Sequence, residues 1–199
     1  MTQTKWIIKS SKDDKKPLLD RLLEIRGLTK KSEIDEFLNP LEMELSMPTA
    51  FSDMEKAVER ISTAIEKGEK ILVYGDFDAD GITSTSILLK TLNYLGANVD
   101  YFIPDREADG HGLNKTKLVK LLTQKIKLVI TVDCGISNLE EVAFLKSFKV
   151  DCILTDHHEA PEELPEAYAI INPKAPNALS SDLPIKKIEH LTALAGCGV

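Results

Sequence analysis

From about residue 54 onward, short apolar runs alternate with amphipathic stretches along this chain. The runs have the length of β-strands, and the stretches between them space their hydrophobic residues as helices do. We expect strands at 70–74, 98–103, 127–132 and 150–154, and helices at 54–67, 82–95, 114–123 and 137–147. Strands joined by helices of this length predict an α/β fold with a doubly wound parallel sheet covered on both faces.

Residues 1–50 follow a different pattern. Helical periodicity runs through 17–25, and Ser32 is a candidate N-cap for a second short helix that ends before Asn39-Pro40. We therefore expect a helical lead over 1–50 and an α/β domain over 51–199. Residues 191–199 are apolar and helix-like, unlike a usual polar terminus, and this favours a chain that forms the N-terminal part of a longer protein.

Polar groups follow three of the predicted strands. They form the segments Asp76-Phe77-Asp78-Ala79-Asp80-Gly81, Val132-Asp133-Cys134-Gly135 and Asp156-His157-His158. The carboxyl ends of parallel strands meet at one edge of a sheet, so we expect these side chains to converge there. Clustered carboxylates repel one another unless cations neutralise them, and the pattern therefore predicts a divalent metal site.

Simpler interpretations exist for parts of this pattern. A calcium loop would need a glutamate at its twelfth position, where this chain has Ile87, and a helix in place of the strand before it. A phosphate-binding P-loop would need Gly-Lys-Ser/Thr after Gly75, which the sequence lacks. Taken singly, Asp133 is a candidate cap for a helix near Ser137, and adjacent histidines are often a surface pair. Three strand ends carrying such groups together favour the metal site.

Composition narrows the class of protein. With 199 residues, 43% hydrophobic and 29% charged, the chain fits one globular α/β domain with a small addition. A net charge of −7 argues against binding nucleic acid through a broad basic face, although bound cations would offset part of it. The lysines between 115 and 127 form a local basic cluster, which is equally typical of a solvated helix face.

Cysteine content and hydropathy exclude other classes. Three cysteines are too few for a disulfide framework or a zinc ribbon, and we expect Cys134 and Cys152 to be small buried residues. A thiolate ligand at Cys134 is the less favoured alternative. No apolar run has the length of a membrane span, and the polar N-terminus has no signal region. We expect a cytoplasmic protein without a membrane partner.

The mixture of ligand types indicates the metal. Aspartate together with histidine favours Mn²⁺ over Ca²⁺, and Mg²⁺ suits an oxygen-rich position. Asp133, from a central strand, is well placed to bridge two cations, which would stabilise the attacking and leaving oxygens of a phosphoryl transfer. In the loop 104–112, Arg106 is a candidate to neutralise charge on a phosphate, or else to pair with a neighbouring acid of that loop, Asp105, Glu107 or Asp109.

Several ordered motifs resemble those of the DHH phosphoesterase superfamily, namely Gly75–Gly81, Thr131–Gly135 and Thr155–His158. Within it, the chain from about residue 50 to its end is similar to the RecJ family of single-stranded-DNA-specific exonucleases. The segments that carry this similarity are Asp76–Gly81, the loop with Arg106 and Gly110-His111-Gly112, Ile171–Lys174 and Ala195–Val199. The helical lead, with Trp6 and Phe37-Leu38-Asn39-Pro40, is also similar.

The resemblance implies a 5′-to-3′ exonuclease that hydrolyses single-stranded DNA in repair and recombination and depends on Mn²⁺ or Mg²⁺. It implies one metal held by Asp76 and Asp78, another held by Asp80 and His157, and Asp133 between the two. It also implies that His158 contacts the scissile phosphate and that Asp156 orients the histidine pair. Arg106 and His111 would take part in substrate binding, although relatives usually carry tyrosine where this chain has His111.

The same resemblance sets limits and alternatives. The family's late acidic motif and substrate-binding domain are absent, so we expect this chain alone to bind metal but to be inactive. In a longer protein, a helicase and a single-strand-binding protein are the expected partners. One alternative is a DHH phosphodiesterase of short oligonucleotides or cyclic dinucleotides, but those enzymes usually begin the first motif with histidine in place of Asp76. Another is a non-catalytic DHH scaffold, but such proteins have lost motif carboxylates.

Overall fold

A computed structural model describes residues 15–39 and 47–199 of the chain. The chain divides into two compact units, 1–45 and 46–199, whereas the sequence pattern suggested a boundary after residue 50. Trp6 and Pro40, which contribute to the resemblance of the lead, lie outside the described residues. Within the described part of the chain, no helix is long and apolar enough to cross a membrane.

The first unit contains the two helices expected in the lead. Helix α1 is Leu18–Ile25 and helix α2 is Lys31–Leu38. Leu23 is the buried residue of α1. The helix ends where Gly27 adopts a φ of 83°, a left-handed conformation that favours glycine, and the N–H of Leu28 returns to the carbonyl of Leu23.

The second unit is built on five parallel strands in the order β2-β1-β3-β4-β5. Their bounds are β1 Lys70–Tyr74, β2 Val99–Phe102, β3 Ile126–Val132, β4 Asp151–Thr155 and β5 Ala169–Ile171. The expected parallel α/β sheet is confirmed. The fifth strand was not predicted, because its three residues are too short to show a period and a loop precedes it in place of a helix.

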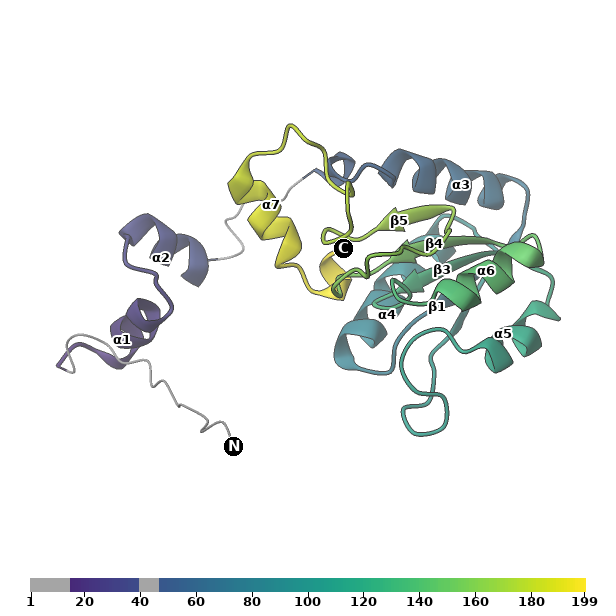
Figure 1. The fold of residues 1–199 in the computed structure, drawn as a ribbon, viewed down its shortest axis with the longest axis horizontal. Helices are drawn as coiled ribbons and strands as arrows, with labels where there is room; N and C mark the ends of the chain where they lie inside the picture. Colours follow the sequence, from purple (N-terminus) through teal and green to yellow (C-terminus); the bar gives the residue numbers. More distant parts are fainter. Residues whose placement is uncertain (1–14, 40–46) are drawn as a thin grey trace. The chain divides into compact units, whose positions relative to one another are not determined.

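Helices connect the first four strands, and further helices precede β1 and follow β5 (Figure 1). They are α3 Met54–Glu66, α4 Ala79–Tyr94, α5 Lys115–Leu122, α6 Leu139–Ser147 and α7 Ile185–Thr192, with turns η2 Pro48–Ala50 and η3 Gly196–Gly198. The expectation of a helix-like segment over 191–199 is wrong beyond Thr192, where α7 ends and a 3-10 turn follows. Gly196 and Gly198 disfavour an α-helix there.

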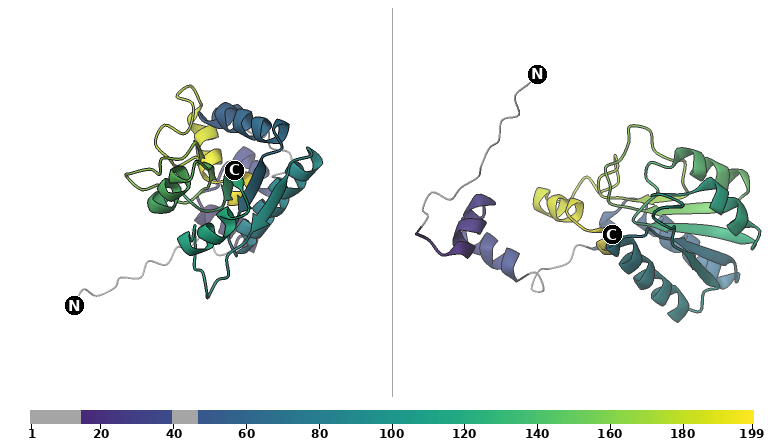
Figure 2. Two further views of the ribbon diagram at one scale, coloured as in Figure 1. Left: turned by 90° about the vertical axis from the view of Figure 1, so that its right-hand side faces the viewer. Right: turned by 90° about the horizontal axis from the view of Figure 1, so that it is seen from below.

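The core has two layers, one on each face of the sheet. Ile71 and Val73 of β1 pack with residues of α3 and α4, whereas Leu72 and Tyr74 pack with residues of α5 and α6. Figures 1 and 2 show helices on both sides of the strands. Alternate residues of a central strand are therefore buried on opposite faces, as a doubly wound sheet requires.

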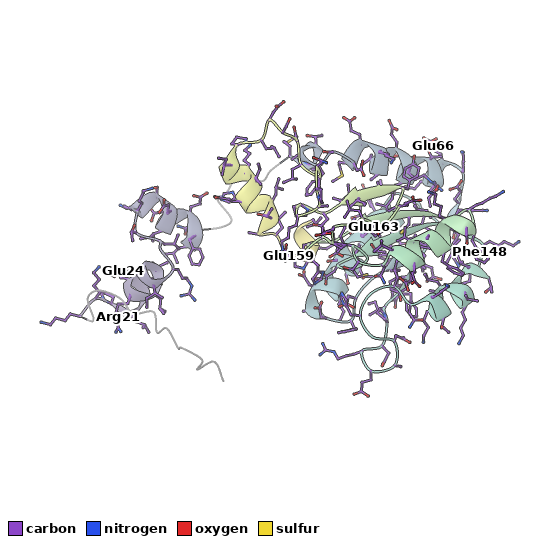
Figure 3. All side chains as sticks on the ribbon, in the orientation of Figure 1. Arg21, Glu24, Glu66, Phe148, Glu159 and Glu163 are labelled. Atoms are coloured by element: carbon purple, nitrogen blue, oxygen red, sulfur yellow. The ribbon has the colours of Figure 1, made fainter. Side chains whose placement is uncertain are left out.

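The amino edge of the sheet is closed by an ion-pair network around Arg60 of α3. Its Nε donates to Asp151 at 2.6 Å and one of its terminal nitrogens donates to Glu69 at 2.7 Å, with the arginine side chain 11% exposed. Figure 3 labels Glu66 and Phe148 toward this end of the unit, and Glu159 toward the other. Strand register brings Tyr74 beside Thr131 and Val132 beside Thr155. The polar segments that follow these strands therefore meet at the carboxyl edge.

Candidate metal centre

The first acidic segment turns directly from strand β1 into helix α4. Asp76 is buried, and the side chain of Asp78 caps the helix by accepting the N–H groups of Asp80 and Gly81, each at 3.0 Å. Gly81 is required here, because a Cβ at this position would lie 2.5 Å from the carbonyl oxygen of Asp76. The turn fixes the carboxylates of Asp76 and Asp78 at the start of α4.

Asp133 follows strand β3 in an unusual backbone conformation. Its φ is 61°, in the left-handed region, and its N–H donates to the carbonyl of Thr155 at 3.0 Å. Only 1% of the residue is exposed, and its Oδ1 has no hydrogen-bond partner among the described residues. Asp133 does not cap a helix, since α6 starts only at Leu139, so the capping interpretation is wrong.

The environment of Asp133 disfavours its charged form. Burial, followed by the charges of Asp80 and Asp78, raises the pKa of the Asp133 carboxyl to about 7. A divalent cation would reverse this penalty, because it supplies the opposite charge beside an oxygen that no donor among the described residues satisfies.

Two groups of ligand atoms share Asp133. Asp76, Asp78 and Asp133 form one group, and Asp133, His157 and His158 form the other, with the ligand atoms of each group within 4.8 Å of one another. Two buried oxygens, Asp76 Oδ1 and Asp133 Oδ1, lack hydrogen-bond partners within the described chain. Nε2 of His157 lies 3.1 Å from that oxygen of Asp133. Unsatisfied carboxylate oxygens facing imidazole nitrogens fit a site for Mn²⁺ or Mg²⁺.

The side chain of Asp156 holds the segment His157-His158 in place through hydrogen bonds. Its Oδ1 accepts the backbone N–H groups of His157 and His158 at 2.7 and 3.1 Å and contacts Nδ1 of His158 at 2.7 Å, while its Oδ2 accepts the N–H of Ile136. A proton on Nδ1 of His158 completes this contact and leaves Nε2 available. Asp156 thus orients the ring of His158, but only the backbone of His157.

The ring of His157 is oriented by a residue that sequence reasoning missed. Its Nδ1 lies 3.0 Å from the carbonyl oxygen of Leu194. A carbonyl only accepts hydrogen bonds, so this contact requires a proton on Nδ1, and in the neutral ring Nε2 is then the acceptor that faces Asp133. No side-chain pattern could have identified this contact, because it uses a backbone atom.

Asp80 lies at the border of the two groups. Its carboxylate accepts the N–H of Gly196 at 2.9 Å and that of Cys197 at 3.1 Å, and it lies 3.6 Å from Nε2 of His157. Burial raises the pKa of the Asp80 carboxyl, but the hydrogen bonds from Gly196 and Cys197 outweigh it, and the net pKa is lowered. Asp80 is adjacent to the ligand groups without belonging to either, and its role as a ligand stays a prediction.

The loop after strand β2 carries the two expected substrate-binding residues. Arg106 places its guanidinium carbon 4.7 Å from the centroid of the Phe77 ring. The structure records no pairing of Arg106 with the acids of its loop, among which Asp109 pairs with Lys117 at 2.8 Å. An aromatic ring beside the first acidic segment therefore holds this arginine near the site.

His111 brings the end of the same loop against the centre. Its Nδ1 lies 3.3 Å from Asp76 Oδ1, and its ring meets that of His158 edge-on with centroids 5.4 Å apart. The side chain of His111 is half-exposed. Its polar ring atoms therefore border both the buried carboxylates and the solvent side of the site.

Cys134 does not contribute a ligand. Its thiol is fully buried and contacts the carbonyl oxygens of Tyr74 and Gly75 at 3.8 and 3.9 Å. Burial raises the pKa of this thiol well above its usual range. Cys134 and Cys152 are buried core residues, as the sequence predicted.

Two lysines of the basic cluster, both on α5, contact other side chains of the unit. Lys117 pairs with Asp109, and the ammonium of Lys115 lies 5.4 Å from the centroid of the Phe144 ring. Both lysines thus have partners within the unit.

Comparison with known proteins gives a match over the part of the chain that contains the metal centre. Residues 70–199 match the DHH family, N-terminal domain. The chain is 40% identical over 183 residues to the single-stranded-DNA-specific exonuclease RecJ of Bacillus subtilis, a match that covers 92% of this chain and 22% of that protein. It is 38% identical over 184 residues to the RecJ of Haemophilus influenzae, covering 92% of this chain and 30% of that protein.

A solved structure agrees with this match. The crystal structure of an exonuclease RecJ bound to manganese superimposes with a TM-score of 0.66 at 35% identity, covering 78% of this chain and 37% of that one. The chain thus spans 22% and 30% of the length of the two curated relatives. The resemblance inferred from the motifs is confirmed, and this chain belongs to the DHH family.

Proposed function

We propose that this chain carries the metal-dependent phosphodiesterase centre of a 5′-to-3′ exonuclease that acts on single-stranded DNA. The observation that carries the proposal is the pair of ligand groups that share the buried Asp133. Identity of 40% to a single-stranded-DNA-specific exonuclease supports the choice of substrate. A non-catalytic scaffold is disfavoured, because all five candidate ligands, Asp76, Asp78, Asp80, Asp133 and His157, are present.

The ligand assignment we propose divides the centre between two ions. Asp76 and Asp78 would hold one, Asp80 and His157 the other, and Asp133 would contact both. When bound, two divalent cations polarise the scissile phosphate and stabilise the attacking and leaving oxygens of its hydrolysis. Hydrogen bonds fix the positions of two of these carboxylates. The side chain of Asp78 accepts from the first turn of α4, and the N–H of Asp133 donates to Thr155 of β4.

The remaining site residues would act on the substrate directly. With Nδ1–H held by Asp156, the half-exposed ring of His158 would contact a phosphate oxygen through Nε2–H when both ring nitrogens carry a proton. Arg106, held over Phe77, would neutralise phosphate charge along the strand. His111 borders the same space and would contact the nucleotide beside the scissile bond. Asp156 would be a positioning residue for His158.

The experiment compares the 199-residue chain with the longest reading frame that contains it. Both are incubated with 5′-labelled single strands, duplexes and oligonucleotides of two to five residues, in Mn²⁺, Mg²⁺ or Ca²⁺. We expect the longer protein to release mononucleotides from single strands in Mn²⁺ or Mg²⁺. We expect the chain alone to bind Mn²⁺ and to hydrolyse little, because precise positioning of the strand needs further protein.

Matched variants test the centre. Asp78→Asn keeps an oxygen that caps α4 but removes the charge, so it should abolish hydrolysis and weaken Mn²⁺ binding. Asp100→Asn, on the edge strand β2, removes a half-exposed carboxylate outside the centre and should change neither. Preferred cleavage of the shortest oligonucleotides would instead indicate an oligonucleotide phosphodiesterase. Absence of both Mn²⁺ binding and hydrolysis would indicate a scaffold.

The setting of the proposed enzyme follows from its substrate. Single strands arise when a helicase separates a duplex, and they are covered by single-strand-binding protein. We therefore propose a helicase and such a protein as partners of the longer protein, and the cytoplasm as its location. Pull-down from a lysate in which each candidate partner carries a tag would test these associations.

A further inference from the structure

The turn Leu194–Cys197 contacts the metal centre through three backbone groups, and the thiol of Cys197 also hydrogen-bonds Asp80. The carbonyl of Leu194 meets Nδ1 of His157 at 3.0 Å, and the N–H groups of Gly196 and Cys197 donate to Asp80 at 2.9 and 3.1 Å. A carbonyl and two N–H groups thus hold one imidazole and one carboxylate of the centre.

The turn approaches so closely that residue 196 has to be glycine. A Cβ at Gly196 would lie 2.5 Å from Oδ1 of Asp133 and 2.8 Å from its Cγ. Asp133 has little freedom to withdraw, because it is buried, has a φ of 61° and is tied to the carbonyl of Thr155. A side chain at position 196 therefore displaces either the turn or a metal ligand.

A second glycine, Gly198, directly follows this turn in η3 and supplies a matched control. A Cβ at Gly198 would have as its nearest contact Cδ2 of Leu194, at 3.2 Å. That atom is the end of a flexible leucine side chain, which can move by the few tenths of an ångström required. Alanine at 198 is therefore compatible with the turn, whereas alanine at 196 is not.

We propose that Leu194–Cys197 is a positioning turn that sets the tautomer of His157 and that Gly196 is the residue that permits it. The Leu194 carbonyl keeps the proton on Nδ1, so Nε2 faces Asp133 as a bare ligand atom. The two N–H groups hold Asp80 in place beside it. This inference rests on the proposed metal centre for its purpose, but the tautomer itself is a property of the metal-free protein.

The test uses the 199-residue chain, its Gly196→Ala and Gly198→Ala variants, and two readouts. Nitrogen-15 NMR of the metal-free proteins identifies which ring nitrogen of His157 carries the proton at a pH where the ring is neutral. Calorimetric titration measures Mn²⁺ affinity. We expect Nδ1–H in the wild type and in Gly198→Ala, a mixed or reversed tautomer in Gly196→Ala, and about a 10- to 100-fold loss of Mn²⁺ affinity in that variant alone.

Several results would overturn the proposal. One is a wild-type His157 protonated on Nε2, which needs no variant to be observed. Another is a Gly196→Ala protein with wild-type tautomer and affinity. If Gly196→Ala fails to fold, a chain ended after Ala193 removes the turn without a clash, and an unchanged tautomer there would equally refute the role. Absence of Mn²⁺ binding by the wild type would count against the proposed function, while the metal-free tautomer would still decide the role of the turn.

Discussion

Replacing Asp133 by asparagine is expected to stabilise the metal-free chain at pH 8. The carboxylate is buried, and its Oδ1 lacks a hydrogen-bond partner in the described part of the chain. Burial and the charges of Asp80 and Asp78 raise its pKa to about 7. Asparagine keeps the shape of the side chain and tolerates the left-handed φ of 61° at this position. The substitution therefore removes an unfavourable charge with little backbone strain.

The size of the effect follows from the two pKa values. The pKa of Asp133 rises from 3.8 to about 7 in the folded chain, and this difference corresponds to about 4 kcal/mol. Solvent beside the half-exposed His158 screens the charges, so we expect about 2 kcal/mol. A carboxyl with a raised pKa stabilises the fold below pH 3.8, and that contribution is lost as pH rises to about 7. The advantage of the asparagine variant should therefore be absent near pH 4 and complete above pH 7.

Urea unfolding followed by circular dichroism measures this difference in the presence of a chelator between pH 4 and pH 8. Adding Mn²⁺ at about 100 times its Kd should then stabilise the wild type by about 2.7 kcal/mol and the variant far less. Asp100→Asn should match the wild type in both conditions. A variant that is less stable than the wild type at pH 8 without metal, or a difference that does not shrink toward pH 4, would refute the reasoning.

Other substitutions test neighbouring parts of the structure. Asp156→Asn should lower the free energy of unfolding by about 1–3 kcal/mol with or without metal, because its oxygens accept three backbone N–H groups and contact His158; equal urea midpoints would contradict this. Arg106→Ala should lower the salt dependence of single-strand binding by the longer protein by about one phosphate contact, measured by fluorescence anisotropy, and leave Mn²⁺ affinity unchanged. Arg60→Ala leaves the partly exposed carboxylates of Glu69 and Asp151 without this partner and should cost about 1–3 kcal/mol in urea unfolding. Lys146→Ala, which breaks an exposed pair, should cost less than about 1 kcal/mol.

The central strands could be predicted from sequence because each is an uninterrupted apolar run ending in a polar group. That pattern located Asp76, Asp133 and Asp156 at one edge of the sheet. Strand β5 was missed because three residues cannot display a period. Helix α7 was not predicted either. Its apolar residues Ile185, Ile188 and Leu191 have helical spacing, but eight residues are too few to show this period clearly.

The side chains of the candidate site could be predicted from the sequence, whereas the backbone groups that contact them could not. The carboxylates and histidines have a sequence signature, whereas the carbonyl of Leu194 and the N–H of Gly196 have none, since every residue carries these groups. The contact of Arg106 with Phe77 depends on how the loop after β2 folds back, which neither periodicity nor turn chemistry specifies. Sequence reasoning therefore located the candidate ligand side chains but not the backbone contacts that hold them.

The hydrogen bond between Gly196 and Asp80 joins residues 116 positions apart, and this separation has a consequence for synthesis. At about 5–20 residues per second, the first acidic segment leaves the ribosome about 6–23 s before the turn that completes its surroundings. Contacts of such long range form late, after the local helices and the pairing of neighbouring strands. A cation that binds the finished centre is therefore a late ligand of an existing sheet. It should slow unfolding of the native state and leave the rate of folding nearly unchanged.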